Sequence, residues 1–311
     1  MFSVIFPGQG SQIIGMGKDL YDRYDIVKKL FKEADEVLRV NLSKIIFEGP
    51  KEELDLTINT QPAIFLISYS IFKLAKEEFN KDLGKAKFFA GHSLGEYSAL
   101  SCAKYLKFSD TIKILRARGD AMQNSVPQGE GGMIAILGSK IDAIEKILKD
   151  YQNKFNVEIA NDNSEGQIVV SGKIIDLKNL TEILNEKSIK NLKLPVSAPF
   201  HSKLMGKATD IMKLEIDKLN FQDGKNILIS NVTAKEIENK DDLKKLLIEQ
   251  IESRVRWRES VIYMISKGIK QFIEIGPGKV LSNLVKRIDR KIEINTINDE
   301  NDIKNLKIWS I

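Results

Sequence analysis

The chain has 311 residues, of which 42% are hydrophobic and 29% are charged, a composition typical of globular proteins and not of disordered ones. Its net charge of +5 comes from basic and acidic residues that are interspersed without a basic block, which argues against nucleic-acid binding. One cysteine and two histidines can form neither an internal disulfide nor a Cys/His metal site, so we expect a reducing compartment and no metal.

No segment predicts export or membrane insertion. The first residues lack a charged region followed by a long apolar stretch, so we predict no signal peptide. No run reaches the roughly 18 uninterrupted apolar residues of a membrane span. We therefore expect a cytoplasmic chain that does not bind membranes.

The first part of the chain alternates apolar runs with helical periodicity. An apolar run that stops at Pro7-Gly8 predicts a buried strand over Phe2–Phe6. The next predicted elements are a helical stretch over Met16–Leu38, a helix over Gln61–Phe79, a strand over Lys87–Ala90 and a helix over Leu94–Tyr105. The helix over Gln61–Phe79 is apolar on most faces, which is typical of a buried helix.

The middle of the chain has a different order of predicted elements. Its elements are predicted as strand, helix, strand, strand, helix, strand over Met133–Leu137, Ile141–Asp150, Val157–Ala160, Gln167–Ser171, Leu177–Leu184 and Leu192–Val196. This β-α-β-β-α-β order is the ferredoxin-like arrangement. We expect residues 129–197 to form a subdomain of this kind, inserted into an α/β core made of residues 1–128 and 198–311.

The last part returns to the first pattern. It predicts strands over Asn226–Ser230 and Gln271–Ile275, and helices over Leu243–Ile251, Val261–Ile265 and Val280–Arg287. The sequence thus predicts an α/β fold in which the core is interrupted once.

Gly91-His92-Ser93-Leu94-Gly95 is a G-x-S-x-G motif between a predicted strand and a predicted helix, which is the context of a nucleophile elbow. Small flanking residues allow the tight turn that raises the Ser93 hydroxyl above the sheet edge. The N–H of Leu94, at the start of the helix, then points to where an oxyanion forms. The glycines alone would also suit a plain strand-to-helix connection, but the context favours a nucleophile.

A serine needs a general base to be nucleophilic near neutral pH, and the chain has two histidines. His92 adjoins Ser93, and because neighbouring side chains diverge from a tight turn, a structural role on the elbow is favoured for it. His201 lies 108 residues after Ser93, in a loop with two prolines where the predicted insert ends. By elimination we predict His201 as the base; either an acid or a backbone carbonyl can orient its ring.

Six motifs in chain order resemble one known family, the malonyl-CoA:acyl carrier protein transacylases of dissociated fatty-acid synthesis. The motifs are Phe6-Pro7-Gly8-Gln9-Gly10-Ser11-Gln12, Gly91-His92-Ser93-Leu94-Gly95-Glu96-Tyr97, Arg118-Gly119 with Met122-Gln123, Asn163-Ser164 with Gly166-Gln167, Ala198-Pro199-Phe200-His201-Ser202, and Glu274-Ile275-Gly276-Pro277-Gly278. Each is moderately specific, but all six in order are very specific. The resemblance implies a hydrolase-like α/β core with a parallel sheet and an inserted ferredoxin-like subdomain, in agreement with the predicted elements.

The resemblance also implies the catalytic roles. Ser93 is then the nucleophile, His201 is the base, and the backbone N–H groups of Gln12 and Leu94 form the oxyanion hole. The reaction is a ping-pong transfer of malonyl from malonyl-CoA to the phosphopantetheine thiol of acyl carrier protein, through a malonyl-serine ester.

The resemblance assigns substrate binding to Arg118, with Gln12 and His92 lining the site. Taken alone, Arg118 looks like any exposed arginine. In the family position, its guanidinium offers a two-donor fork that matches the malonyl carboxylate. The bulk of Phe200 is implied to favour malonyl over methylmalonyl.

In the family, a main-chain carbonyl in the loop before a Val-x-Trp sequence orients the histidine. That sequence is Val255-Arg256-Trp257 here, so the resemblance implies the carbonyl of Ser253. The family commonly has Asn-Pro where this chain has Ser253-Arg254, and a missing proline can alter the loop.

We therefore predict an acyl carrier protein S-malonyltransferase of fatty-acid biosynthesis, a monomer without a cofactor, whose partners are malonyl-CoA, CoA and acyl carrier protein. Three alternatives stay open. They are a malonyl-specific acyltransferase of a polyketide pathway, a serine thioesterase or esterase, and a non-enzymatic module that docks the carrier protein.

Overall fold

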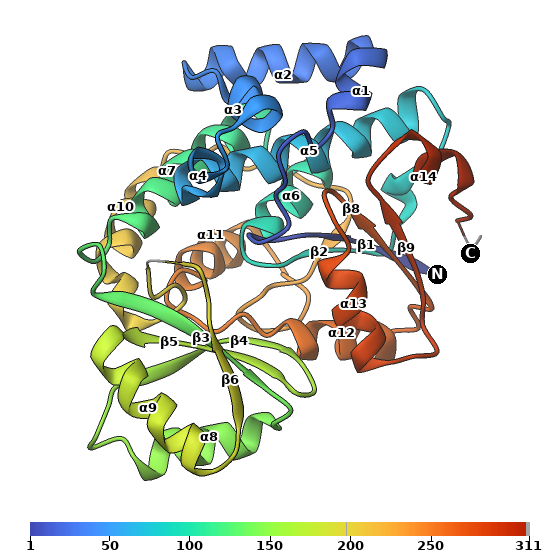
Figure 1. Cartoon of the computed structure of the whole chain (residues 1–311). Helices are drawn as coiled ribbons and strands as arrows, with labels where there is room; N and C mark the ends of the chain where they lie inside the picture. Colours follow the sequence, from blue (N-terminus) through green and yellow to red (C-terminus); the bar gives the residue numbers. More distant parts are fainter. Residues whose placement is uncertain (197, 309–311) are drawn as a thin grey trace.

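The computed structural model describes residues 1–196 and 198–308. Ser197, the predicted end of the insert, and residues 309–311, the predicted end of the core, lie outside the described residues. Figure 1 shows a larger part that contains both termini and a smaller green and yellow part below it.

The larger part begins with β1 (Phe2–Phe6), α1 (Lys18–Arg23), α2 (Asp25–Leu38), α3 (Leu42–Glu48), α4 (Lys51–Asp55), α5 (Thr57–Glu77), the 3₁₀ helix η1 (Leu83–Lys85), β2 (Phe88–Gly91), α6 (Leu94–Cys102) and α7 (Phe108–Gln123). The smaller part contains β3 (Gly131–Leu137), α8 (Ile141–Asp150), β4 (Val157–Ser164), β5 (Gln167–Lys173), α9 (Ile174–Glu186) and β6 (Lys190–Lys193). The larger part resumes with η2 (Lys203–Met205), α10 (Gly206–Asp217), β7 (Ile227–Leu228), α11 (Lys240–Glu249), α12 (Trp257–Ser266), β8 (Gln271–Ile275), α13 (Val280–Ile288), β9 (Glu293–Ile297) and α14 (Glu300–Asn305).

The core of the larger part is a five-stranded parallel sheet in the order β7-β2-β1-β8-β9. Its central strands are apolar at nearly every position because helices cover both faces. Along β1, Val4 and Phe6 pack into the cluster that includes α2, α5 and α7, whereas Ile5 packs into the cluster with α12 and α13. Figure 1 shows α5 and α6 above the sheet and α12 and α13 below it. This confirms the predicted α/β core with a parallel sheet.

The smaller part is a four-stranded antiparallel sheet in the order β4-β5-β3-β6. The connectivity confirms the predicted ferredoxin-like β-α-β-β-α-β arrangement. Alternate residues divide its two faces: Ile134 and Ile136 pack in a cluster with α8 and α9, whereas Met133 and Ala135 join the large core cluster. Hence one face of the subdomain sheet packs toward the core and toward the site described below. The exact boundaries at residues 129 and 197 stay a prediction.

Several elements differ from the prediction in their bounds, and β9 and α14 among others were not predicted. The helical stretch over Met16–Leu38 is two helices, because Tyr24 has an extended backbone between α1 and α2. The last subdomain strand ends at Lys193, not Val196; its ladder with β3 stops there, two residues before Pro195, which has no N–H to donate. The strand predicted over Asn226–Ser230 is reduced to the two residues of β7 at the sheet edge.

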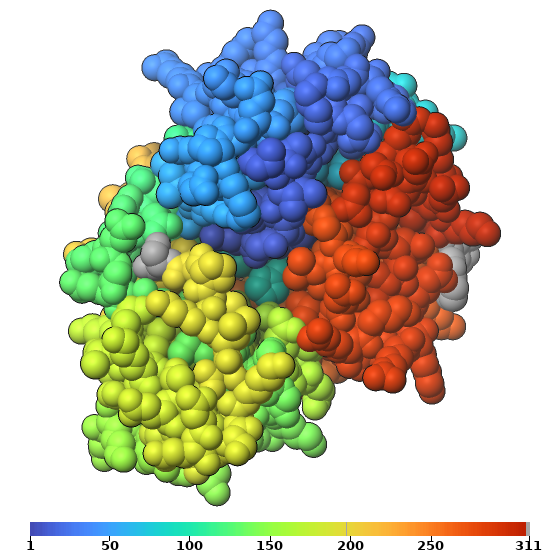
Figure 2. Space-filling view, viewed as in Figure 1, coloured from blue at the N-terminus to red at the C-terminus, as the bar shows by residue number. Residues whose placement is uncertain are grey.

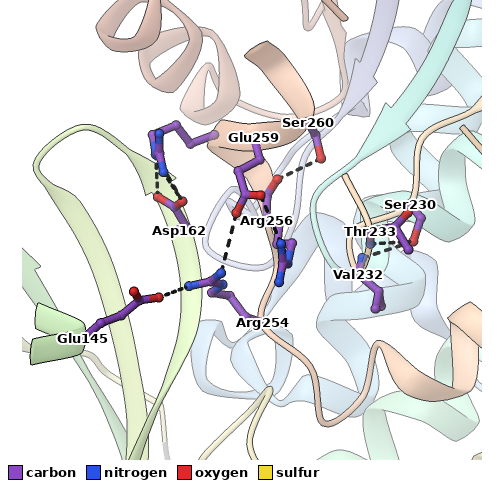
Figure 3. A network of polar contacts seen from close by, with 10 residues as sticks. Glu145, Asp162, Ser230, Val232, Thr233, Arg254, Arg256, Glu259 and Ser260 are labelled. Atoms are coloured by element: carbon purple, nitrogen blue, oxygen red, sulfur yellow. Dashed lines mark hydrogen bonds and ion pairs between the residues drawn. The ribbon is translucent and has the colours of Figure 1, made fainter. Parts of the chain in front are cut away.

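Ion pairs join the subdomain to the core (Figure 3), and backbone hydrogen bonds add to them. Asp162 of β4 is fully buried and accepts three bonds of 2.8–3.1 Å from the guanidinium of Arg258 on α12. The Asp162 N–H donates to the Val255 oxygen, and Val255 donates to Ala160. On the surface, Arg254 pairs with Glu145 of α8 at 2.8 Å. These contacts hold β4 and α8 of the subdomain against α12 and the chain segment that precedes it.

Candidate active site

Ser93 occupies a strained turn between β2 and α6, with φ 54° and ψ −111°. A Cβ on Gly91 would lie 1.9 Å from the backbone of Gly95, and a Cβ on Gly95 would lie 2.2 Å from the Phe6 oxygen. Such distances exclude a side chain at either position. Both glycines of the motif are therefore required by the close approach of the turn, its helix and β1.

A side chain that the sequence analysis missed holds this turn. Asn231 accepts from the Ser93 N–H and donates to the Gly91 oxygen, both at 2.7 Å. The Ser93 N–H is thus occupied. The Leu94 N–H, at the first position of α6, has no acceptor within its helix, as at any helix start. Leu94 also lines the pocket beside Ser93.

Ser93 Oγ and His201 Nε2 lie 2.8 Å apart. The other ring nitrogen, Nδ1, lies 2.8 Å from the main-chain oxygen of Gln250. A carbonyl only accepts, so Nδ1 carries the proton and Nε2 accepts from the serine hydroxyl. Burial, reinforced by the positive charge of Arg118, lowers the pKa of His201 to about 3, which keeps the ring neutral and able to accept a proton.

The main carbonyl that orients His201 is that of Gln250, three residues before the predicted Ser253. Gln250, just after α11, supplies the bond to Nδ1, whereas the Ser253 carbonyl acts on His201 only as a weaker hydrogen-bond acceptor that also raises its pKa. The loop turns here: Ser253 donates its own N–H to the Glu249 oxygen. The carbonyl of Gln250 is therefore the main group that holds the imidazole, and that of Ser253 is secondary.

Arg118, on α7, is 1% exposed. Its Nη1 donates to Gln61 at 2.8 Å, and its Nη2 donates to Gln250 Oε1 at 2.8 Å and to Ser93 Oγ at 3.1 Å. Its Nε has no partner among the described residues. Burial lowers the pKa of Arg118, as expected for a desolvated cation, although the nearby Glu96 carboxylate acts in the opposite direction. The guanidinium therefore retains capacity to bind an anionic ligand next to the nucleophile.

Gln250 connects most of these groups, and sequence reasoning did not identify it. Its Nε2 donates to Glu96 Oε2 at 2.6 Å and to the Ser93 oxygen at 3.1 Å, while its Oε1 accepts from Arg118. The sequence contains no local motif around it. Only the packing of the chain after α11 against the elbow brings it to the site.

The hollow between the subdomain and the core contains a cavity of about 120 Å³ that opens to the surface. Figure 2 shows the face on which the green and yellow subdomain meets the blue and red parts of the core. The lining residues are Gln9, Gln61, His92, Ser93, Leu94, Arg118, Met122, Met133, Asn161, Leu194, Val196, Phe200 and His201. Six of the predicted site residues are thus brought together. The small volume favours a short acyl group.

Gln12 is not among the lining residues of this cavity. Its side chain accepts from the Gly10 N–H and donates to Asp55 on α4. Gln9 lines the cavity instead. Phe6 of β1 lies opposite Gly91 of β2, and a Cβ on Gly8 would lie 2.7 Å from the His92 oxygen, so the first residues after β1 lie beside the elbow. The side-chain contacts of Gln12 do not test the predicted role of its backbone N–H in the oxyanion hole.

His92 has a structural partner, as the sequence reasoning favoured. Its Nε2 lies 2.8 Å from Asn163 Oδ1 of β4, and burial lowers the pKa of the ring. Its ring also packs near Trp257, with centroids 5.9 Å apart. His92 therefore links the elbow to the subdomain while one side of it faces the cavity.

Over residues 1–196 and 198–308, no group of three or more His, Cys, Asp or Glu side chains is arranged to hold a metal ion. In the same part of the chain, no helix is both long and apolar enough to span a membrane.

The model of the family described as "Acyl transferase domain" matches residues 3–304. A malonyl CoA-acyl carrier protein transacylase of Bacillus subtilis strain 168 is 44% identical over 302 residues, which cover 96% of this chain and 94% of that protein. The chain belongs to the malonyl CoA-acyl carrier protein transacylase family. The acyl-carrier-protein S-malonyltransferase of Bartonella henselae has a crystal structure similar to this transacylase fold, with a TM-score of 0.94, 40% identity and 97% of both chains covered.

A second solved transacylase is described as a malonyl-transacylase in complex with its type II polyketide acyl carrier protein. It matches with a TM-score of 0.92 and 35% identity, over 97% of both chains. The matches cover both the parallel-sheet core and the subdomain of this transacylase.

Proposed function

We propose that this chain transfers a malonyl group from malonyl-CoA to the phosphopantetheine thiol of acyl carrier protein. One observation carries the substrate assignment: a buried guanidinium, that of Arg118, lies 3.1 Å from Ser93 Oγ in a small cavity. A carboxylate at the far end of a short acyl group would meet this cation while its thioester meets the serine.

In the proposed reaction, His201 Nε2 takes the Ser93 proton as Oγ attacks the thioester carbon. The oxyanion is held by the N–H of Leu94 and, in place of Gln12, by that of Gln9. The C–S bond then breaks, His201 returns the proton to the CoA sulfur, and malonyl-Ser93 remains. A carrier thiol reverses these steps, giving its proton to His201, and leaves as the malonyl thioester.

The test is the intact mass of the protein after brief exposure to malonyl-CoA. Wild type is expected to gain one malonyl group, and Ser93→Ala none. Ser266→Ala, which removes an exposed serine on α12 that does not line the cavity, is the matched control and should label fully. Labelling of Ser93→Ala would overturn the proposal.

A second measurement separates the transferase from a thioesterase. Malonyl-enzyme is isolated and incubated with or without the thiol form of acyl carrier protein. A transferase loses malonyl to the carrier much faster than to water, whereas equal loss in both arms indicates a thioesterase. Because one solved relative is described in complex with a polyketide carrier, comparing kcat/KM for a fatty-acid and a polyketide carrier decides the pathway; we propose fatty-acid biosynthesis.

We also propose a monomeric cytoplasmic enzyme that needs no cofactor besides its substrates. The one cysteine, Cys102, is buried and unpaired, which fits a reducing compartment. Light scattering after size-exclusion chromatography measures the oligomeric state, and dialysis against a chelator should leave the rate unchanged.

A further inference from the structure

Two opposite buried charges lie behind the nucleophile with one neutral side chain between them. Arg118 and Glu96 are each 1% exposed. Gln250 bridges them: its Oε1 accepts from Arg118 at 2.8 Å, and its Nε2 donates to Glu96 Oε2 at 2.6 Å. A carboxylate only accepts, so Glu96 determines which end of the amide faces Arg118.

Within residues 1–196 and 198–308, Arg118 is the ionised group that acts on Glu96. Its Oε2 also accepts from the Asn231 N–H at 3.2 Å, and its Oε1 has no partner among the described residues. The charged or titratable groups that act on it there are Arg118 of α7 and the neighbouring Tyr97 of α6. Burial raises the pKa of Tyr97 to about 12, so its phenol stays neutral. In the empty site, Glu96 therefore supplies the negative charge that balances Arg118.

We propose that Glu96 is the counter-ion of Arg118 in the empty site and takes up one proton from solvent when an acyl carboxylate binds Arg118. This step rests on the proposed role of Arg118. A second anion in the same buried region repels Glu96, and one guanidinium balances one carboxylate. The unpartnered Oε1 can carry the proton without displacing the bonds to Oε2.

The pKa of Glu96 supports this geometry. Burial raises it to about 7 in the empty site, against the hydrogen bonds from Gln250 and Asn231 and the charge of Arg118, which lower it. A bound malonyl carboxylate raises it further. Between these two pKa values, binding takes up a proton, so the affinity for malonyl-CoA falls as the pH rises above about 7, by at most about ten-fold per pH unit.

The test is calorimetry on Ser93→Ala, which binds but cannot form the ester. At pH 8, the binding enthalpy of malonyl-CoA is measured in buffers of different ionisation enthalpy. The slope of the binding enthalpy against the buffer ionisation enthalpy gives the number of protons taken up. We expect close to one proton with malonyl-CoA and close to none with acetyl-CoA; both ligands have the CoA phosphates, so their titration cancels. The uptake should disappear in Ser93→Ala/Glu96→Gln and persist in Ser93→Ala/Glu249→Gln, a matched change of a partly exposed acid on α11.

The outcomes are distinguishable. Uptake that persists in Glu96→Gln would assign the proton elsewhere and overturn the proposal. A preference for malonyl-CoA over acetyl-CoA without uptake overturns only the role of Glu96, whereas equal binding of both contradicts the role of Arg118 itself. If Glu96→Gln does not fold, the Kd of Ser93→Ala for malonyl-CoA is measured between pH 6 and 9. A Kd that rises with pH supports proton uptake, and a Kd that does not change with pH contradicts it.

Discussion

The guanidinium of Arg118 donates to Ser93 Oγ at 3.1 Å, so the cation that we propose for carboxylate recognition lies directly against the nucleophile. Both terminal nitrogens of Arg118 are engaged, by Gln61 on one side and by Gln250 and Ser93 on the other. This arrangement uses the planar fork of arginine, which an ammonium group does not reproduce.

We expect Arg118→Ala to lower kcat/KM for malonyl-CoA by about 150- to 5,000-fold, from the loss of a buried ion pair worth about 3–5 kcal/mol. Arg118→Lys should also lower it, because an ammonium group keeps the charge but loses the planar fork. Acetyl transfer should fall far less, because acetyl has no carboxylate to pair. Arg116→Ala is the control: Arg116 lies two residues away and donates to Asn59 outside the cavity. Selectivity that is unchanged in Arg118→Ala would contradict the assignment.

His201 should stay neutral far below the pH at which histidine usually titrates. Since its pKa is lowered to about 3, the rate of acylation is expected to show no acidic limb near pH 6.5. Arg118→Gln removes a positive charge that lowers this pKa, so the pKa rises and the base is lost at a higher pH. Single-turnover acylation with acetyl-CoA from pH 4.5 to 8 measures the pH profiles of wild type and Arg118→Gln. A fall in the wild-type rate with a midpoint near pH 6.5 would refute the expectation.

Gly91→Ala should abolish acylation and lower the yield of folded protein, because its Cβ would lie 1.9 Å from the backbone of Gly95. Gly206→Ala provides the matched control. Gly206 begins α10 with φ −52°, and a Cβ there meets nothing within 4 Å. This change should be neutral or stabilise the fold by about 0.4–1 kcal/mol. Denaturant unfolding followed by circular dichroism measures both variants.

The ion pairs at the subdomain junction differ in their expected contribution to stability (Figure 3). Arg258→Met leaves the buried Asp162 carboxylate unpaired, which should lower the free energy of unfolding by about 3–5 kcal/mol. Arg254→Met removes ion pairs with Glu145 and Glu259, whose side chains are partly exposed, and should cost about 1 kcal/mol or less. Adding Asp162→Asn to Arg258→Met is expected to recover part of the loss; equal effects of the two arginine variants would contradict this ranking.

Local patterns predicted the elements whose character is encoded over a few residues. The apolar run of β1, the alternation of the subdomain and the glycines around Ser93 each depend on neighbours close in sequence, and the structure agrees with them. The break at Tyr24 and the shortened strand β7 were not predictable in this way. They depend on how helices pack and on where the sheet ends.

The sequence by itself determined the α/β fold, the ferredoxin-like order of the insert, and the pairing of Ser93 with the one other histidine, because motif spacing and elimination need no coordinates. Only the tertiary structure decided which backbone groups and neutral side chains surround that pair. Gln9, and not Gln12, lines the cavity, and Gln250, more than Ser253, holds the His201 ring. These contacts join residues far apart in the chain, and a carbonyl or an amide has no sequence pattern that reveals where it will be packed.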